Sequence, residues 1–234
     1  MIKVFKESKN NYGTKKIKKE LRKKNIIASR KKLGQIMKKY SLVSRYSVKK
    51  YKPIKNKVNE DKVENIVDRD FERDSLEVVV SDLTYIRVGD KWNYLCTIMD
   101  LFNREVIGYS VGPKKDSNLV YEAFMRCKYP LNKIKVFHTD RGSEFKNKHI
   151  EKALDVFGIE RSLSKKGCPY DNAVIESLYN IVKTEFIKGE KFNNLNELEL
   201  GLFEYFNWYN TKRIHGSLDY LTPVEYRELN KLEN

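Results

Sequence analysis

Hydrophobic and polar positions follow two different rhythms along the chain, and the change comes near residue 75. Before it, apolar residues recur at the three- and four-residue spacing of amphipathic helices, at Ile17, Leu21, Leu33, Ile36 and Met37. Ser29 is a good N-cap residue, so the pattern predicts two short helices joined by residues 25–28. Two short helices with a tight connection are typical of a helix-turn-helix, in which the second helix is the groove reader.

After residue 75, β-branched and aromatic residues predominate. The pattern predicts strands over 76–88, 92–102, 105–112, 135–138 and 160–164, and helices over 117–129, 147–158, 172–188, 195–209 and 222–232. Three consecutive strands followed by alternating helices and strands predict an α/β fold, a mixed five-stranded sheet with helices on its faces. We therefore divide the chain into a helix-turn-helix segment (1–46), a polar linker (47–74), an α/β core (75–190) and a helical C-terminal extension (191–234).

The charge is concentrated in one quarter of the chain. Residues 1–60 hold 21 Lys and Arg against three acids, a net of +18, whereas the other 174 residues hold 26 bases and 29 acids, a net of −3. A basic segment attached to a nearly neutral domain predicts an arm that binds a polyanion, DNA or RNA. The alternative is a solvated tail that only improves solubility.

Composition excludes several other classes of protein. No apolar run approaches the roughly 18 residues of a membrane span, and the lysine-rich N-terminus lacks the apolar stretch of a signal peptide. Three scattered cysteines and three scattered histidines provide neither a disulfide framework nor a zinc site. These features predict a reduced, cytoplasmic protein.

Three acids occupy unusual positions. Asp82 interrupts a row of β-forming residues, although acids are rare in strands. Asp140 follows the strand in KVFHTDRGSEF, where an Asp-X-Gly turn is the simpler explanation. Glu176 lies near the start of a helix, where an acid also suits the helix dipole. Together the three can converge at one sheet edge and bind a hard cation such as Mg²⁺ or Mn²⁺.

The spacing of these acids resembles a known superfamily. Asp82 and Asp140 are separated by 57 residues, and Asp140 and Glu176 by 35. This arrangement resembles the retroviral integrase superfamily of DDE recombinases, which share a ribonuclease H-like fold. The segments SDLTYI, DLFNREVIGYSV, FHTDRGSEF, SLSKKGCPYDNAVIESLYNIVKTE and YNTKRIHGSLDYLTPVEY are similar to second-frame (orfB-type) transposases of bacterial insertion sequences. The resemblance extends from about residue 11 to the C-terminus.

The resemblance implies an enzyme. Residues 75–190 would be an integrase-type catalytic core that nicks DNA at insertion-sequence ends and transfers the freed 3′-OH strand, using two Mg²⁺ or Mn²⁺ ions. Asp82 would bridge both ions, and Asp140 and Glu176 would each hold one. The implied partners are double-stranded DNA (terminal inverted repeats and target), further copies of this chain on DNA and the first-frame protein of the element. No membrane is involved, and the expected location is the bacterial cytoplasm, at the nucleoid.

Predicted DNA contacts come from three regions. A helical repeat places Asn172, Glu176, Asn180 and Lys183 on one stripe, and relatives carry a base at the position of Lys183, although a solvated surface lysine is the alternative. His138 flanks the acid and fits either a phosphate-orienting or a packing role. The full predicted set is Lys183, Asn172, Asn180, Arg141, Lys212, Arg213, His215, Arg30, Lys31 and Lys38.

Alternatives remain open at this point. Relatives usually carry further residues before the YG of residues 12–13 and a first-frame helix-turn-helix portion, so the chain could be a truncated copy or one component of the enzyme. It could also be an inactive remnant that only binds element ends, or a non-transposing nuclease of the same fold. Intact acids and the basic arm favour a transposase.

Overall fold

The computed structural model describes residues 1–47, 65, 67, 74–165 and 172–231. Its N-terminal part is a bundle of three helices, α1 (Ile2–Glu7), α2 (Thr14–Lys23) and α3 (Arg30–Lys39), one more than the pattern predicts. The Ser29 hydroxyl accepts a hydrogen bond from the Lys32 N–H at 3.1 Å, which confirms the predicted N-cap. The predicted linker (47–74) falls almost entirely outside the described residues, and the four domain boundaries stay predictions.

The core contains the mixed sheet that the pattern predicts. Its strands are β1 (Val78–Val88), β2 (Lys91–Asp100), β3 (Val106–Gly112), β4 (Val136–Thr139) and β5 (Glu160–Leu163). They lie in the order β3-β2-β1-β4-β5. The first three pair antiparallel, whereas β4 pairs parallel to both β1 and β5.

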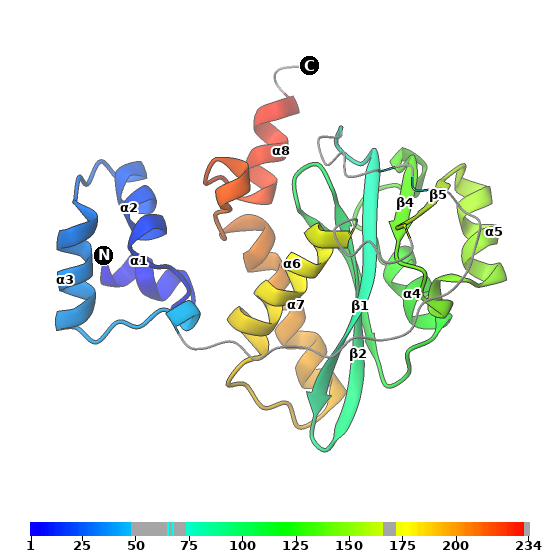
Figure 1. Cartoon of the computed structure of the whole chain (residues 1–234), viewed down its shortest axis with the longest axis horizontal. Coiled ribbons are helices and arrows are strands. Elements are labelled where there is room, and N and C mark those ends of the chain that lie inside the picture. The colour runs from blue at the N-terminus through cyan, green and yellow to red at the C-terminus, as the bar shows by residue number, and fades with distance from the viewer. Residues whose placement is uncertain (48–64, 66, 68–73, 166–171, 232–234) are drawn as a thin grey trace.

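Helices cover both faces of the sheet (Figure 1). On one face lie α4 (Ser117–Met125) and α5 (Lys148–Phe157), and on the other α6 (Ala173–Val182) and α7 (Leu195–Thr211). Because strand side chains alternate, Val78 and Val80 of β1 pack toward α6 while Val79 packs toward α4. This three-layer arrangement makes β1 the buried centre of the domain.

The helix predicted over 172–188 changes character partway. It is α-helical to Val182 and continues as a π-helical turn, Lys183–Ile187. The last helix is α8 (Pro223–Lys231), and short 3-10 turns lie at Arg45–Ser47, Leu131–Lys133, Ser143–Phe145 and Gly216–Leu218. A π-helical turn is rare and frequently marks a functional or strained position.

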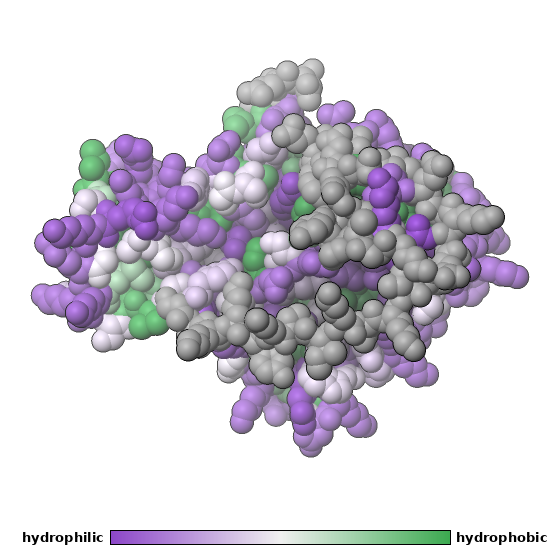
Figure 2. All heavy atoms as spheres, viewed as in Figure 1, coloured by the Kyte–Doolittle hydropathy of each residue, from purple (hydrophilic) through white to green (hydrophobic). Residues whose placement is uncertain are grey.

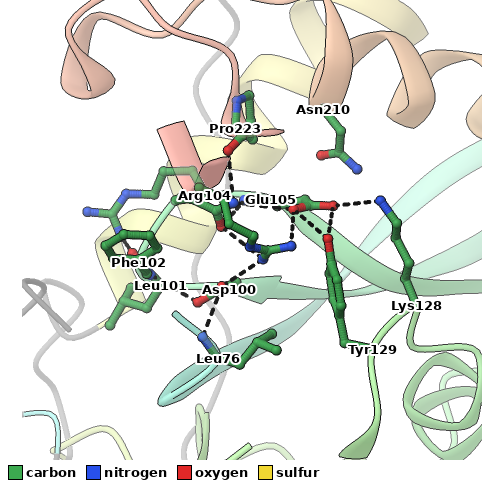
Figure 3. Close-up of polar contacts among 12 residues, drawn as sticks. Leu76, Asp100, Leu101, Phe102, Arg104, Glu105, Lys128, Tyr129, Asn210 and Pro223 are labelled. Atoms are coloured by element: carbon green, nitrogen blue, oxygen red, sulfur yellow. Dashed lines mark hydrogen bonds and ion pairs between the residues drawn. The ribbon is translucent and has the colours of Figure 1, made fainter. Parts of the chain in front are cut away.

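A buried ionic network joins α8 to the sheet (Figure 3). The Arg227 guanidinium lies 2.9 Å from Asp100 Oδ2 and 2.6 Å from Glu105 Oε2. Glu105 also pairs with Lys128 at 3.3 Å and accepts a hydrogen bond from the Tyr129 hydroxyl at 3.2 Å. The two carboxylates are fully buried, so α8 is an integral part of the core.

The N-terminal bundle packs against the C-terminal half of the chain. Ile214 is part of the bundle's hydrophobic core. Its N–H donates to the Tyr12 hydroxyl at 2.8 Å, and the Trp208 indole N–H donates to the Glu7 carbonyl at 3.1 Å. The bundle is therefore docked beside α7, as Figure 1 shows.

Glu185 is the centre of this docking interface. Its buried carboxylate forms hydrogen bonds with the Arg213 guanidinium at 2.7 and 2.8 Å, the Tyr205 hydroxyl at 3.1 Å and the Tyr46 hydroxyl at 2.5 Å. Arg45 donates to the Glu185 carbonyl at 2.6 Å. Arg213 holds the pKa of Glu185 below its ordinary value despite burial, so the carboxylate is ionised. The π-helical turn after α6 is thus tied directly to the end of the bundle.

Candidate active site

Asp82 and Asp140 lie side by side because of the strand register. The parallel pairing of β1 with β4 ends at Ser81 and Thr139, and each acid is the next residue of its chain segment. The Asp82 carboxylate accepts the Leu83 N–H at 2.7 Å, and the Asp140 carboxylate accepts the Gly142 N–H at 2.9 Å. The structure thus brings these two predicted acids to the same point of the sheet.

Glu176 lies in the first turn of α6, and Tyr179 of the same helix fixes that helix over β1. The Tyr179 hydroxyl donates to the Asp82 carbonyl oxygen and accepts a hydrogen bond from Thr97 Oγ1 at 2.9 Å. Thr97 is the β2 residue opposite Asp82. Because Glu176 precedes Tyr179 by about one turn, it lies on the same side of α6, and its exposed carboxylate acts electrostatically on Asp82.

The acids interact electrostatically. Burial first, and then the negative charges of Asp140, Glu176 and Glu144, raise the pKa of Asp82 to about 8, although the hydrogen bond from the Leu83 N–H lowers it. Burial and then Glu144 raise the pKa of Asp140, and burial raises that of Glu176. Such mutual repulsion favours a bound cation or proton at this point.

Sequence reasoning missed two charged neighbours of this site. Glu144 is buried, and its carboxylate pairs with the Lys115 ammonium at 2.9 Å. A Cβ at Gly142 would lie 2.4 Å from Glu144 Oε1 and 2.9 Å from Asp140 Oδ1, so a larger residue there would displace these carboxylates. Glu144 stands in the same TDRGSEF segment as Asp140, which was the available signal; nothing in the sequence indicated Lys115.

The donor set suits a hard divalent cation, although the carboxylates are not gathered into a finished site. Among the described residues, no three His, Cys, Asp or Glu side chains stand close enough together to hold a metal ion. Asp82 and Asp140 supply oxygen ligands at neighbouring positions, and Glu176 is exposed and free to turn toward them. Carboxylate oxygens are the ligands that Mg²⁺ and Mn²⁺ prefer, so the residues fit such ions once Glu176 moves inward.

Several predicted DNA contacts lie near these acids. The half-buried Lys183 ammonium lies 4.5 Å from the centroid of the Tyr85 ring, and burial lowers its pKa while Asp82 raises it. Arg141 donates to the Ser164 carbonyl at 2.9 Å. Asn180 is exposed on α6, whereas Asn172 is buried at its N-terminus.

Other predicted contacts lie on the N-terminal bundle and beyond α7. Arg30, Lys31 and Lys38 are exposed on α3, and Lys212 is exposed at the end of α7. Figure 2 shows largely hydrophilic side chains over the N-terminal bundle.

The structure does not leave two of the predicted DNA contacts, Arg213 and His215, exposed. Arg213 and His215 are buried, because Arg213 neutralises Glu185 and His215 packs edge-on against Tyr209 with ring centroids 4.7 Å apart. Burial and then Arg213 lower the pKa of His215 well below its ordinary value. Neither side chain is exposed while the bundle is docked. His138, also fully buried, shares a 2.8 Å hydrogen bond with Ser162, which is a packing role.

Comparison with known families matches nearly the whole chain. Two family profiles described as "Integrase core domain" match residues 72–169 and 176–230, and one described as "HTH-like domain" matches residues 1–50. The match to the HTH-like domain supports the predicted helix-turn-helix character of the N-terminal segment. No helix among the described residues is both long and apolar enough to cross a membrane.

Curated relatives match over most of their own length. The transposase for insertion sequence element IS904 of Lactococcus lactis subsp. lactis (strain IL1403) is 32% identical over 97% of this chain and 91% of its own. The putative transposase InsK for insertion sequence element IS150 of Escherichia coli (strain K12) is 31% identical over 96% and 80%. The transposase InsF for insertion sequence IS3A of the same strain is 30% identical over 98% and 81%.

A solved structure shares the fold. A chain of the simian T-cell lymphotropic virus intasome, in complex with PP2A regulatory subunit B56 gamma, superposes with a TM-score of 0.52. It covers 76% of this chain and 59% of that chain at 14% identity. At this identity the likeness shows the fold alone, and it confirms the predicted ribonuclease H-like, integrase-type architecture.

Proposed function

Because the chain belongs to the insertion-sequence transposases that carry an integrase core domain, we propose that it is a DDE transposase that nicks DNA at the ends of its element and transfers the 3′-OH strand. Asp82, Asp140 and Glu176 are the proposed catalytic residues and metal ligands. The observation that carries the proposal is the convergence of the segments that bear these acids: Asp82 and Asp140 follow the last β1–β4 pair, and Tyr179 fixes the helix of Glu176 on Asp82.

The proposed reaction is in-line transfer at a phosphodiester. Two divalent cations, when bound, would activate the attacking oxygen and stabilise the leaving 3′-oxygen. Asp82 lies between Asp140 and α6, and the three carboxylates of Asp82, Asp140 and Glu176 would hold the ions. Water as the nucleophile gives nicking, and a DNA 3′-OH gives strand transfer. No covalent enzyme intermediate is needed.

The remaining residues would position DNA. Lys183 lies on the first turn after α6, close enough to Asp82 that the charge of Asp82 acts on its ammonium. It would contact a DNA phosphate next to the reacting phosphate. The exposed bases Arg30, Lys31 and Lys38 of α3 would contact the element end, since phosphate contacts fix the register of a groove-reading helix. The docked bundle would then hold that DNA in a defined direction relative to the acids.

The test uses a duplex carrying one end of the DNA element, taken from the inverted repeats that flank the gene. In Mg²⁺ or Mn²⁺ the wild-type chain should nick this end and join its 3′-OH to a second duplex, whereas Asp82→Asn, Asp140→Asn and Glu176→Gln should do neither. Binding of the same duplex in metal-free buffer should be retained by all three variants. If one of these variants kept wild-type activity, the acid that it replaces would not be a catalytic residue.

The same assay separates the alternatives. Nicking of any duplex without joining would identify a nuclease of the same fold. End binding without nicking or joining, even after the first-frame protein is added, would identify an inactive end-binding protein. Because the transposase relatives match over 80 to 91% of their own length, strand transfer is the expected result.

A further inference from the structure

The β1–β2 hairpin extends beyond the rest of the sheet and carries an exposed aromatic pair. β1 continues to Val88, although its pairing with β4 stops at Ser81. On this extension Tyr85 and Trp92 are 51% and 54% exposed, and their rings meet edge to face with centroids 5.1 Å apart. Large aromatic side chains gathered on an open surface indicate a binding site more often than isolated ones do.

Two cations accompany this pair. The Lys183 ammonium lies 4.5 Å from the Tyr85 ring centroid, and the Arg87 guanidinium carbon lies 6.0 Å from the Trp92 ring centroid. Proteins that bind single-stranded nucleic acid combine these same elements, since bases stack on aromatic rings while nearby cations contact the backbone phosphates. The chemistry of the hairpin therefore matches an unpaired stretch of DNA.

The hairpin also lies at a useful distance from the acids. Tyr85 follows Asp82 by three residues, about 10 Å along an extended strand, and this odd spacing directs the two side chains to opposite faces of β1. A stacked DNA strand rises about 3.4 Å per nucleotide, so this distance spans about three nucleotides. Lys183 links the two side chains, because its ammonium lies over the Tyr85 ring and within electrostatic reach of Asp82. Lys183, which contacts Tyr85, belongs to the turn that continues the helix of Glu176.

We propose that Tyr85 and Trp92 form a stacking platform for an unpaired nucleobase within about three nucleotides of the reacting phosphate. The identity of the ligand as DNA at the active site rests on the proposed function. Bases inside a duplex offer no free face, so the platform favours ends whose terminal pairs have opened. It would hold the opened strand so that its phosphate reaches Asp82 and Asp140.

The experiment measures binding of three labelled DNAs to the full chain without divalent metal: a short duplex with an unpaired 3′ thymidine tail, the same duplex with an abasic tail, and the blunt duplex. Tyr85→Ala and Trp92→Ala should each weaken binding of the thymidine-tailed DNA by about 5- to 150-fold, the range for one lost base–aromatic stack. Binding of the abasic-tailed and blunt DNAs should not change.

Tryptophan fluorescence gives a second readout. The chain has two tryptophans, and Trp208 is buried, so quenching by added DNA reports chiefly on Trp92. The thymidine tail should quench this emission and the abasic tail should not. Tyr85→Phe and Trp92→Phe should keep tight binding of the thymidine-tailed DNA, because phenylalanine retains a ring face.

The matched control is Tyr121→Ala, a 39% exposed tyrosine on α4. It should leave all three affinities unchanged. An equal loss with all three DNAs would overturn the proposal and assign the pair a structural role, and no loss with any DNA would overturn it as well. Since no catalysis is measured, this result is separate from the proposed function, whose own failure would be absent nicking and joining by the wild-type chain.

Discussion

Asp82→Asn should stabilise the metal-free protein while abolishing its activity. The pKa of Asp82 is raised from 3.8 to about 8, first by burial and then by Asp140, Glu176 and Glu144. Between these two pH values the folded chain holds a proton that the unfolded chain has lost, so stability falls as pH rises through this window. One pH unit is worth about 1.4 kcal/mol, so the full cost above pH 8 is at most about 5–6 kcal/mol.

Asparagine carries no charge, so the variant avoids this cost. We expect the free energy of unfolding of Asp82→Asn to exceed that of the wild type by several kcal/mol at pH 9 in chelator, and to differ little at pH 4. Urea denaturation at a series of pH values measures the difference. Mg²⁺ should raise the wild-type midpoint more than that of the variant, because a cation relieves the same repulsion.

Asp155→Asn is the matched control, since Asp155 is exposed on α5. Its stability should stay within about 0.5 kcal/mol of the wild type at every pH. If Asp82→Asn were no more stable than the wild type at pH 9 in chelator, the carboxylate would not carry the electrostatic strain inferred here, and the acids would not form a cation site by mutual repulsion.

Three further outcomes are expected. Arg213→Met removes one partner of a buried ion pair and should lower the free energy of unfolding, measured by urea denaturation, by about 3–5 kcal/mol. Glu190→Ala, at an exposed ion pair, should lower it by less than about 1 kcal/mol. Equal losses for the two variants would contradict the docking interface. Tyr179→Phe should lower the free energy of unfolding by about 1–3 kcal/mol and slow strand transfer, because the buried carbonyl of Asp82 loses its hydrogen-bond donor. Unchanged activity would show that this hydrogen bond is not needed to position α6. Removing residues 1–73 should lower the affinity for duplex DNA. It should also reduce the slope of log affinity against log salt concentration by about 0.9 for each lost phosphate contact. Equal slopes for the full and truncated chains would show that the basic segment does not contact DNA. That truncation should also lower stability, since Ile214 and Glu185 lose their partners.

Local signals in the sequence determined the elements and the identity of the acids. Ser29 supplies its own N-cap hydrogen bond, and Gly158 ends α5 in the left-handed conformation at φ 67°. Strand alternation and helical spacing depend only on neighbours in the chain, so they could be read directly. Asp82 was noticeable because a carboxylate in a strand needs a compensating partner.

Contacts between distant segments were decided only by the tertiary structure. Arg213 looked like an exposed base because its sequence neighbours are polar, yet it neutralises Glu185, 28 residues away. Arg227 meets Asp100 across 127 residues, and Tyr46 meets Glu185 across 139. No spacing rule encodes such pairs, because burial of a charge depends on which elements pack over it. For the same reason, the sequence did not predict the ion pair of Lys115 with Glu144 or the hydrogen bond of Tyr179 to the backbone of Asp82. The sequence thus predicted which acids form the proposed site, whereas only the packing of distant segments determined which of the basic side chains are exposed.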